Sequence, residues 1–157
     1  MTETILSPVN HTMADARKII VGIGTDYLGA TGAEASARPK AGDTVTRPDG
    51  SLVKWRDFTT PQAVLLGEVI RDAATSPAVL YAHTTIDRPR AGAGSFGIVA
   101  DDAIKICLNG ECVYDAPHVL SSVQVDEKIV PVTFKRGVNT VLVKAENVLD
   151  VGGFVLR

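Results

Sequence analysis

The stretch AIKICLNGECVYD, residues 103–115, decides the fold expected for this chain. Asn109-Gly110 lies at its centre and is a strong signal for a two-residue β-hairpin, because both central residues of a type I′ turn need a positive φ. The turn places Cys107 opposite Cys112 across the two strands. Alternation along the strands then predicts two faces. The core face carries Ile104, Ile106, Leu108 and Val113, and the opposite face carries Lys105, Cys107, Cys112 and Tyr114.

The residues just before the hairpin match a different pattern. GAGSFGIV, residues 92–99, has the glycine spacing of a protein-kinase phosphate loop, and Lys105 follows in the sequence AIK. Lys105 comes only eight residues after Gly97, which leaves no room for a strand, a turn and a return strand. No helical pattern follows Gly97, so a Rossmann site is excluded too. We therefore expect Lys105 to be an outward strand residue and Gly92–Gly97 to form a loop and strand entry.

The chain after residue 78 is a series of short strand signals. The segments are rich in Val, Ile and Thr and are separated by turn residues, which is typical of an antiparallel sandwich rather than of βαβ units. The expected strands are 78–86, 95–100, 103–108, 111–115, 127–134, 137–147 and 152–157. We predict an all-β fold, an antiparallel β-sandwich of the jelly-roll type with at most one short helix.

The first half of the chain gives weaker signals. Residues 16–23 and 53–60 are expected to be strands, and residues 60–74 a short helix with Thr60 as N-cap. Residues 1–15 are polar and show no hydrophobic period, so they are expected to be an arm. The predicted organisation is this arm followed by a single β-sandwich domain, 16–157.

The composition excludes several classes of function. Of the 157 residues, 45% are apolar and 22% charged, which suits one domain with a sizeable core. The formal net charge of −2 argues against nucleic-acid binding, because neutralising phosphates needs clustered Lys and Arg. No stretch approaches the roughly 18 apolar residues of a membrane helix, so no membrane insertion is expected. No basic region followed by an apolar run opens the sequence, so no secretory signal is expected.

The facing cysteines leave three states open. In a two-residue hairpin, the position next to the pair that flanks the turn is a non-hydrogen-bonded one with Cα atoms about 4.5 Å apart, which permits a disulfide between Cys107 and Cys112. Two free thiols in a reducing compartment are the second state. A metal site is the third, with weaker support because no histidine lies nearby in the sequence.

The second half of the chain resembles a known family. AVLYAHTTIDRP, GIVADDAIKICLNGECVYD, IVPVTFKRGVNTVLVKAEN and GGFVLR follow one another in an order similar to that of galactose-binding-like jelly-roll modules. Such modules are attached to bacterial polysaccharide-degrading and surface proteins. The resemblance covers roughly residues 18–157 and implies a non-catalytic carbohydrate-binding module.

Asp101 and Asp102 also resemble a segment of the protective-antigen-type sugar-binding β-domains. In lectins of that type, two successive aspartates hold a calcium ion that coordinates sugar hydroxyls, so the resemblance implies a possible Ca²⁺ cofactor at these two residues. Calcium takes six to eight oxygen ligands, which suits paired carboxylates. The alternative is that the two aspartates cap a turn and accept backbone hydrogen bonds.

Sugar contacts are expected from aromatic and polar side chains. The tryptophans of the family are replaced here, for example by Cys107 and Val138, so other residues must serve. The candidates are Tyr27, Arg38, Trp55, Tyr114 and Asn147. Trp55 alternates with Phe58 and Val53 in a strand, which favours packing, whereas Tyr114 is expected to face outward.

No catalytic constellation stands out, so we expect no enzyme. The three histidines, His11, His83 and His118, are scattered. Asp101 and Asp102 are adjacent in sequence rather than held across a cleft as glycoside hydrolysis requires.

Two functions remain. The first is a carbohydrate-binding module with a glycan as partner. The alternative is a structural or assembly protein, such as a virion decoration or surface-layer component, whose N-terminal arm docks on a neighbouring chain. Both functions imply an extracellular, cell-surface or virion-surface location, and the sequence itself leaves the compartment open.

Overall fold

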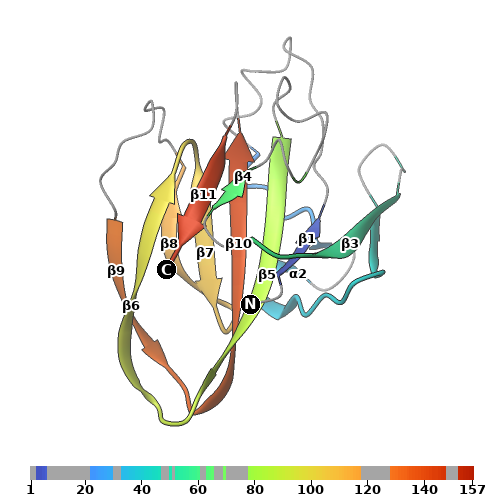
Figure 1. Ribbon diagram of the computed structural model, residues 1–157. Helices are drawn as coiled ribbons and strands as arrows, with labels where there is room; N and C mark the ends of the chain where they lie inside the picture. The colour runs from blue at the N-terminus through green and yellow to red at the C-terminus, as the bar shows by residue number, and fades with distance from the viewer. Residues whose placement is uncertain are drawn as a thin grey trace.

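The protein is an antiparallel β-sandwich (Figure 1). The computed structural model describes the backbone of residues 3–6 and, in full, residues 22–29, 33–46, 50, 52–60, 63–65, 69, 78–117, 128–147 and 152–157. A seven-stranded sheet has the order β2-β3-β1-β5-β10-β7-β8, and a four-stranded sheet has the order β4-β11-β6-β9. The all-β class expected from the sequence is confirmed, and the described residues include one helix of four residues, α2.

The bounds of the elements in the seven-stranded sheet follow its order. They are β2 Thr44–Thr46, β3 Leu52–Phe58, β1 Glu3–Leu6, β5 Ala78–Arg88, β10 Gly137–Asn147, β7 Ile104–Leu108 and β8 Glu111–Ala116. The second sheet consists of β4 Val64–Leu65, β11 Gly153–Leu156, β6 Gly92–Ala100 and β9 Lys128–Phe134. Helix α2, Ala33–Ser36, precedes β2 in the chain.

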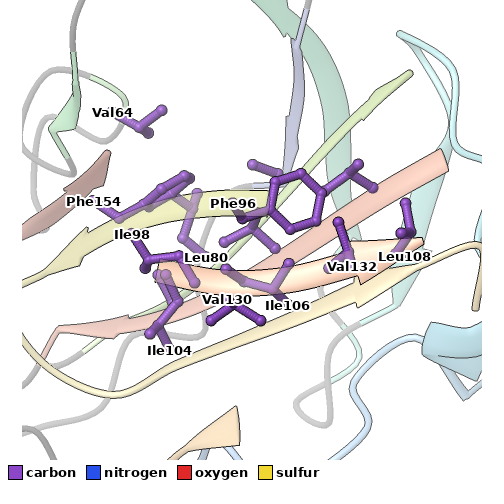
Figure 2. Close-up of a cluster of buried hydrophobic side chains, with 14 of the residues drawn as sticks. Val64, Leu80, Phe96, Ile98, Ile104, Ile106, Leu108, Val130, Val132 and Phe154 are labelled. Atoms are coloured by element: carbon purple, nitrogen blue, oxygen red, sulfur yellow. The ribbon is translucent and has the colours of Figure 1, made fainter. Parts of the chain in front are cut away.

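The main core lies between the two sheets (Figure 2). Strand alternation produces it, because every second residue of a strand points to the same face. Along β10, for instance, Val141, Val143 and Ala145 point into this core and are at most 4% exposed. Phe96 and Phe134 of the four-stranded sheet meet edge to face, with ring centroids 5.7 Å apart. We call this surface of the seven-stranded sheet its inner face.

The other side of the same sheet, its outer face, is also covered. A second cluster joins Val79 and Tyr81 of β5 and Leu142 of β10 to residues of the segment 22–46 and of β3. Leu28, Ala37, Val45, Val53, Trp55 and Cys107 complete it. Residues 22–29 and 33–43, which precede β2, therefore act as a third, irregular layer over part of the sheet.

The hairpin predicted from Asn109-Gly110 is confirmed. Both residues have a positive φ, 54° and 89°, and Cys107 pairs with Cys112. Gly110 has a second requirement, because a Cβ at this position would lie 2.4 Å from the carbonyl oxygen of Ala35 in α2. The tip of the hairpin therefore rests against α2.

One prediction about the hairpin is wrong, the outward orientation of Tyr114. The register shifts between Ile106 and Cys107, so that Ile106 pairs with Tyr114 and Val113 is the extra residue of a bulge. The bulge inverts the alternation beyond it. Tyr114 is consequently half-buried on the Ile106 side and packs against the main core.

Asn139 ties the hairpin to the neighbouring strand. Its side chain is fully buried, and its Oδ1 accepts hydrogen bonds from Asn109 Nδ2 and the Lys135 backbone N–H, both at 2.9 Å. Its Nδ2 donates to the carbonyls of Lys135 and Gly137, both at 2.9 Å. Asn139, the Asn of the GVNTVLV motif, thus connects the turn at Asn109-Gly110 to the turn at residues 135–137 by hydrogen bonds.

Three further expectations differ from the structure. Gly92–Gly97 lies inside β6 rather than in a loop. The predicted helix 60–74 is wrong at Val64–Leu65, which form β4 and pair with β11. Short apolar runs fit strands and helices equally well, and here Val64 completes the inner core. Residues 22–25 form a turn at the end of the predicted strand 16–23, whose other residues lie outside the described ones.

The predicted arm also differs in part. Residues 3–6 form β1, which pairs with β3 and β5 of the same chain. The rest of 1–15 lies outside the described residues. The boundary at residue 15 and the docking of the arm on another chain stay predictions.

Candidate functional site

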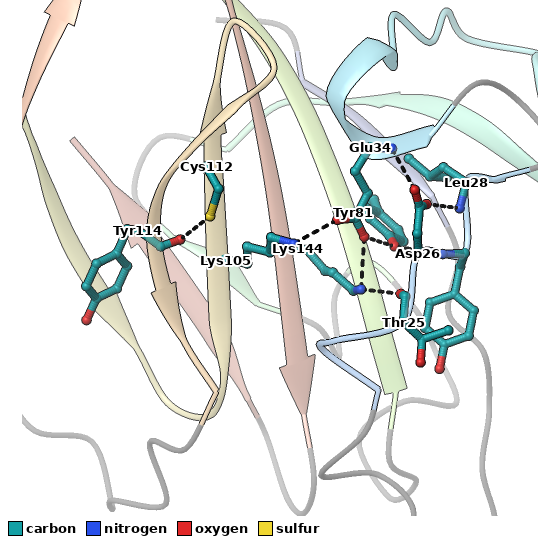
Figure 3. A network of polar contacts seen from close by, with 10 residues as sticks. Thr25, Asp26, Leu28, Glu34, Tyr81, Lys105, Cys112, Tyr114 and Lys144 are labelled. Carbon is teal, nitrogen blue, oxygen red and sulfur yellow. Dashed lines mark hydrogen bonds and ion pairs between the residues drawn. The ribbon is translucent and has the colours of Figure 1, made fainter.

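A buried charge network lies on the outer face of the seven-stranded sheet (Figure 3). Its centre is the carboxylate of Glu34, which follows the first residue of α2. Glu34 Oε1 accepts hydrogen bonds from the Tyr81 hydroxyl at 2.6 Å and from Lys144 Nζ at 2.9 Å. Glu34 Oε2 accepts one from Lys105 Nζ at 3.2 Å. Lys105 lies on the face opposite the main core, as expected for an outward strand residue, and its ammonium is paired with Glu34 there.

The segment that carries Glu34 is itself held in place. Asp26 Oδ1 accepts the backbone N–H of Leu28 at 2.8 Å, and its Oδ2 accepts the backbone N–H of Glu34 at 3.0 Å. Lys144 Nζ also donates to the carbonyl oxygen of Thr25. Lys144 thus binds this segment to β10 at two points, the Thr25 carbonyl and the Glu34 carboxylate.

The network shifts the titration of its members. Burial alone would raise the pKa of Glu34, but the hydrogen bonds from Tyr81 and Lys144 and the charge of Lys105 hold it below its usual value. Burial lowers the pKa of Lys144, which is 2% exposed. Burial and then the Glu34 carboxylate raise the pKa of Tyr81. These groups are bonded to one another, so we interpret their role as structural rather than chemical. We call the network of Glu34, Tyr81, Lys105 and Lys144 the clasp.

A second glutamate on β10 has the opposite electrostatics. Glu146 is 4% exposed, accepts a hydrogen bond from the backbone N–H of Ile23, and its Oε1 has no hydrogen-bond partner among the described residues. Burial is the main reason that its pKa is raised to about 7, and the nearby Asp102 adds to the rise. Its carboxyl group therefore changes charge near neutral pH.

An open pocket of about 430 Å³ adjoins the same layer. It lies between the segment 28–44 and β3, and its walls are formed by Leu28, Ala37, Arg38, Pro39, Gly42, Asp43, Thr44 and Trp55. Backbone hydrogen bonds fix the two sides: Gly42 N–H donates to the Trp55 carbonyl at 2.8 Å, and Trp55 N–H donates to the Asp43 carbonyl at 2.9 Å. We call this the Arg38 pocket.

The polar side chains of the Arg38 pocket are accessible. Arg38 and Asp43 are exposed, and Arg38 donates to the carbonyl oxygen of Ala37 at 2.6 Å. Trp55 is only 3% exposed, so its indole is mostly packed in the outer cluster, and the residue also lines the pocket. The pocket offers charged donors and acceptors above an apolar floor.

The predicted sugar contacts are brought together in part. Arg38 and Trp55 share one pocket. Tyr27 is half-buried on the same outer face, where the Lys144 ammonium lies 5.3 Å from its ring centroid. Tyr114 lies on the inner side of the hairpin, and Asn147 is 1% exposed at the end of β10, where it packs against Gly152. Those last two residues do not join the pocket.

Sequence reasoning missed several members of the network and the pocket. They are Glu34, Asp43, Thr44, Lys144 and Glu146. One signal was available: Lys144 and Glu146 are two residues apart in an otherwise apolar strand, so both face one side. Nothing local in the sequence marks Glu34 as their partner.

Asp101 and Asp102 lie in the bend between β6 and β7 and are both half-buried. Asp101 donates its backbone N–H to the Gly153 carbonyl at 3.2 Å. The described part of the chain contains no cis peptide bond and no group of three or more His, Cys, Asp or Glu side chains placed to hold a metal ion. For a calcium ion, the two aspartates would thus supply only part of the ligand set.

The cysteine pair is present as two free thiols, with Cys107 buried and Cys112 exposed. The disulfide between Cys107 and Cys112 stays a prediction. None of the helical residues described forms a helix that is long and apolar enough to cross a membrane.

Comparisons with known proteins give limited information. The sequence matches no protein-family model and no curated protein. The chain is similar to the solved PA14 domain of the MpAFP antifreeze protein, with 12% identity, 99% of this chain and 78% of that chain covered, and a TM-score of 0.47. It is also similar to a family 35 carbohydrate binding module from Clostridium thermocellum, with 16% identity, 52% and 75% covered, and a TM-score of 0.35.

A third similarity is to a β-glucosidase from Kluyveromyces marxianus in complex with glucose, with 19% identity, 54% of this chain and 11% of that chain covered, and a TM-score of 0.46. The chain spans about a tenth of the length of the β-glucosidase chains that it matches. At these identities and TM-scores, the similarities carry no argument about function.

Proposed function

We propose that this protein is a non-catalytic carbohydrate-binding module and that the Arg38 pocket is its sugar site. The observation that supports the proposal is the pocket itself, about 430 Å³ in volume and lined by Arg38, Asp43, Thr44 and Trp55. Small-molecule sites typically occupy about 300–1,000 Å³ and combine an apolar wall with a few placed polar groups.

The chemistry of the lining suits a sugar ring. A guanidinium presents several fixed donors, and a carboxylate accepts two hydrogen bonds at once, so Arg38 and Asp43 together can bind neighbouring hydroxyl groups. Thr44 adds a hydroxyl that both donates and accepts. Trp55 and Leu28 also line the pocket and supply an apolar surface for ring carbons. The proposed role is binding, because the titratable side chains of the lining, Arg38 and Asp43, do not form a pair of a nucleophile and a base.

Calcium assistance through Asp101 and Asp102 is the finer part of this proposal. Carboxylate oxygens are the ligands that calcium prefers, and backbone carbonyls, water or sugar hydroxyls would have to complete the ligand set. This arrangement would place the ion outside the Arg38 pocket, whose lining does not include either aspartate.

A glycan array tests the main proposal. The folded wild-type chain should bind at least one glycan class, and Arg38→Ala should abolish that binding. Arg56→Ala is the matched control, because Arg56 is an exposed arginine on β3 one residue beyond Trp55 and is not part of the pocket lining. Equal binding by wild type and Arg38→Ala would reject the pocket, and no binding to any glycan would reject the function.

The calcium part needs its own arms. Binding should fall on addition of a chelator and recover with added Ca²⁺, and Asp102→Ala should behave like the chelated wild type. Binding that is unchanged by chelator would remove calcium from the proposal and leave the pocket standing.

The assembly function is kept as a second candidate because of the four-stranded sheet. Its outer side has an apolar pocket of about 170 Å³ lined by residues such as Leu65, Val99 and Val155, and Ile129 on β9 is 56% exposed. An oligomer that forms with rising concentration and is lost in Leu65→Lys would support assembly. Val138→Lys is the control, because Val138 is 55% exposed on the other sheet. A monomer at all concentrations would reject it.

A further inference from the structure

The β7–β8 hairpin places the two cysteines of the chain directly opposite each other. Cys107 pairs with Cys112 one position from the turn-flanking pair, where Cα atoms are about 4.5 Å apart in an antiparallel ladder. A disulfide needs Cα atoms about 4.4–6.8 Å apart. The backbone therefore already has the spacing that a bond between the sulfurs requires.

Access to the two thiols is very different. Cys107 is 6% exposed and packs in the outer cluster, whereas Cys112 is exposed and its thiol donates to the Tyr114 carbonyl oxygen at 3.4 Å. A reagent in solution therefore meets Cys112 first. Burial, and next the Cys112 thiol, raise the pKa of Cys107 to about 12, so Cys107 is a poor nucleophile toward dissolved reagents.

The contacts of the hairpin turn hold Cys107 and Cys112 in register. Asn109 is bonded through its side chain and its backbone to Asn139 and Thr140 of β10, and Gly110 rests against the Ala35 carbonyl of α2. Neither strand of the hairpin can slide without breaking these contacts. An attack of one sulfur on the other is therefore intramolecular and preorganised, which favours it over attack by a dissolved thiol.

We propose that Cys107 and Cys112 form a thiol–disulfide exchange site that is oxidised by low-molecular-weight disulfides, with Cys112 as the entry thiol and Cys107 as the resolving thiol. The Cys112 thiolate attacks one sulfur of the small disulfide, forms a mixed disulfide and releases one thiolate. Cys107 then loses its proton to water and attacks the Cys112 sulfur. The Cys107–Cys112 bond forms and the second small thiol leaves, so two protein thiols are oxidised and one small disulfide is reduced.

The neighbouring charges assist the second step. Lys105 is two residues from Cys107 on the same face, and its ammonium favours the Cys107 thiolate as it forms. Once Cys112 is capped as a mixed disulfide, its own contribution to the raised pKa of Cys107 is removed, and burial remains the main cause. The closed loop is short, so the bond adds little stability by chain entropy. This marks an exchange site rather than a structural cross-link.

Glutathione disulfide tests the proposal. The reduced, folded chain is mixed with an excess of it, quenched with acid at intervals and weighed by mass spectrometry. Wild type should end lighter by the mass of two hydrogens, with any single glutathione adduct only transient and mapped to the Cys112 peptide. Cys107→Ser should retain one glutathione, because it has no second thiol to release the adduct. Cys112→Ser should stay unmodified over the same period, because its one thiol, Cys107, is buried.

Three results would overturn it: a lasting glutathione adduct on wild type, a covalent dimer of wild type as the main product, or Cys112→Ser modified as fast as Cys107→Ser. If a serine variant does not fold, the wild-type time course decides alone, because peptide mapping of the first adduct distinguishes Cys112 from Cys107.

Discussion

The two faces of the seven-stranded sheet are closed in different ways. The inner face is covered by a regular sheet and is apolar at its centre, as Leu80, Ile106 and Val141 show with exposures of 0%. The outer face is covered by residues 22–29 and 33–43, which are mostly irregular, and the buried side chains of Glu34, Lys144 and Glu146 at this face can carry charge. The strands of a covering sheet satisfy one another's backbone hydrogen-bonding groups, so such a sheet can cover the core with apolar side chains alone. An irregular segment brings unpaired backbone groups, and charged side chains such as Lys144 satisfy some of them.

The largest expected effect comes from breaking the clasp. Glu34→Ala leaves the ammonium of Lys144, which is 2% exposed, without its carboxylate. Removing one partner of a buried ion pair typically costs about 3–5 kcal/mol. We expect a loss of about 4 kcal/mol in the free energy of unfolding at pH 7, measured by urea denaturation.

The double variant Glu34→Ala/Lys144→Met is the control for the clasp. It removes the uncompensated charge, so it should be more stable than Glu34→Ala alone. A double variant that is less stable than Glu34→Ala would mean that the loss comes from packing rather than from charge.

A truncation on the inner face should cost slightly less. Leu80→Ala removes a fully buried side chain from the main core and should lower the free energy of unfolding by about 3 kcal/mol. No titratable group is involved, so the loss should be the same at pH 5 and pH 8. A loss that varies with pH would show that the two faces are energetically coupled.

The pH dependence of stability separates the faces further. Burial raises the pKa of Glu146 from the usual 4.5 to about 7, so the folded chain holds this proton more tightly than the unfolded chain. Stability should therefore fall as the pH rises from 4.5 to 7, by about 3 kcal/mol, and level off above pH 7. Glu34 acts in another range, since its lowered pKa gives stability that is lost only as the pH falls below 4.5.

Glu146→Gln should remove that slope, because the amide keeps the shape and an acceptor for the Ile23 N–H but cannot ionise. Glu111→Gln, at an exposed position of β8, should leave it unchanged. The measurement is the urea midpoint across pH 5–8. An unchanged slope in Glu146→Gln would assign the proton uptake to another group.

The smallest effect is expected at the pocket. Arg38 is exposed and donates one hydrogen bond to the adjacent Ala37 carbonyl, so Arg38→Ala should change the free energy of unfolding by no more than about 0.5 kcal/mol. Thermal melts of wild type and variant should coincide within a few degrees. A large shift in the melting temperature would mean that Arg38 supports the covering layer rather than a ligand.

The sequence predicted what depends on local signals. Asn109-Gly110 determined the hairpin, and alternation located strands such as 137–147 to the residue. The bulge at Val113 was not predictable, because nothing in the strand itself shows an extra residue, and its consequence was the wrong orientation of Tyr114. The helix expected at 60–74 was wrong at Val64–Leu65 because the inner core competes with local helix preference.

The candidate site was less predictable for the same reason. Arg38 and Trp55 were named separately, and only the fold brings them to one pocket. Glu34 and Lys144 are 110 residues apart in sequence, so no local pattern links them. Pairs of this kind are set by how the irregular segment crosses the sheet.

The Asn109–Asn139 hydrogen bond bears on the order of folding. It spans 30 residues and, together with the Asn109–Thr140 hydrogen bonds, joins the hairpin turn to the start of β10. A two-residue turn can form within microseconds from local interactions, whereas a contact across 30 residues has to wait for a longer loop to close. The β7–β8 hairpin therefore forms early, whereas its turn is bonded to β10 only later, when β10 pairs with β7 and β5.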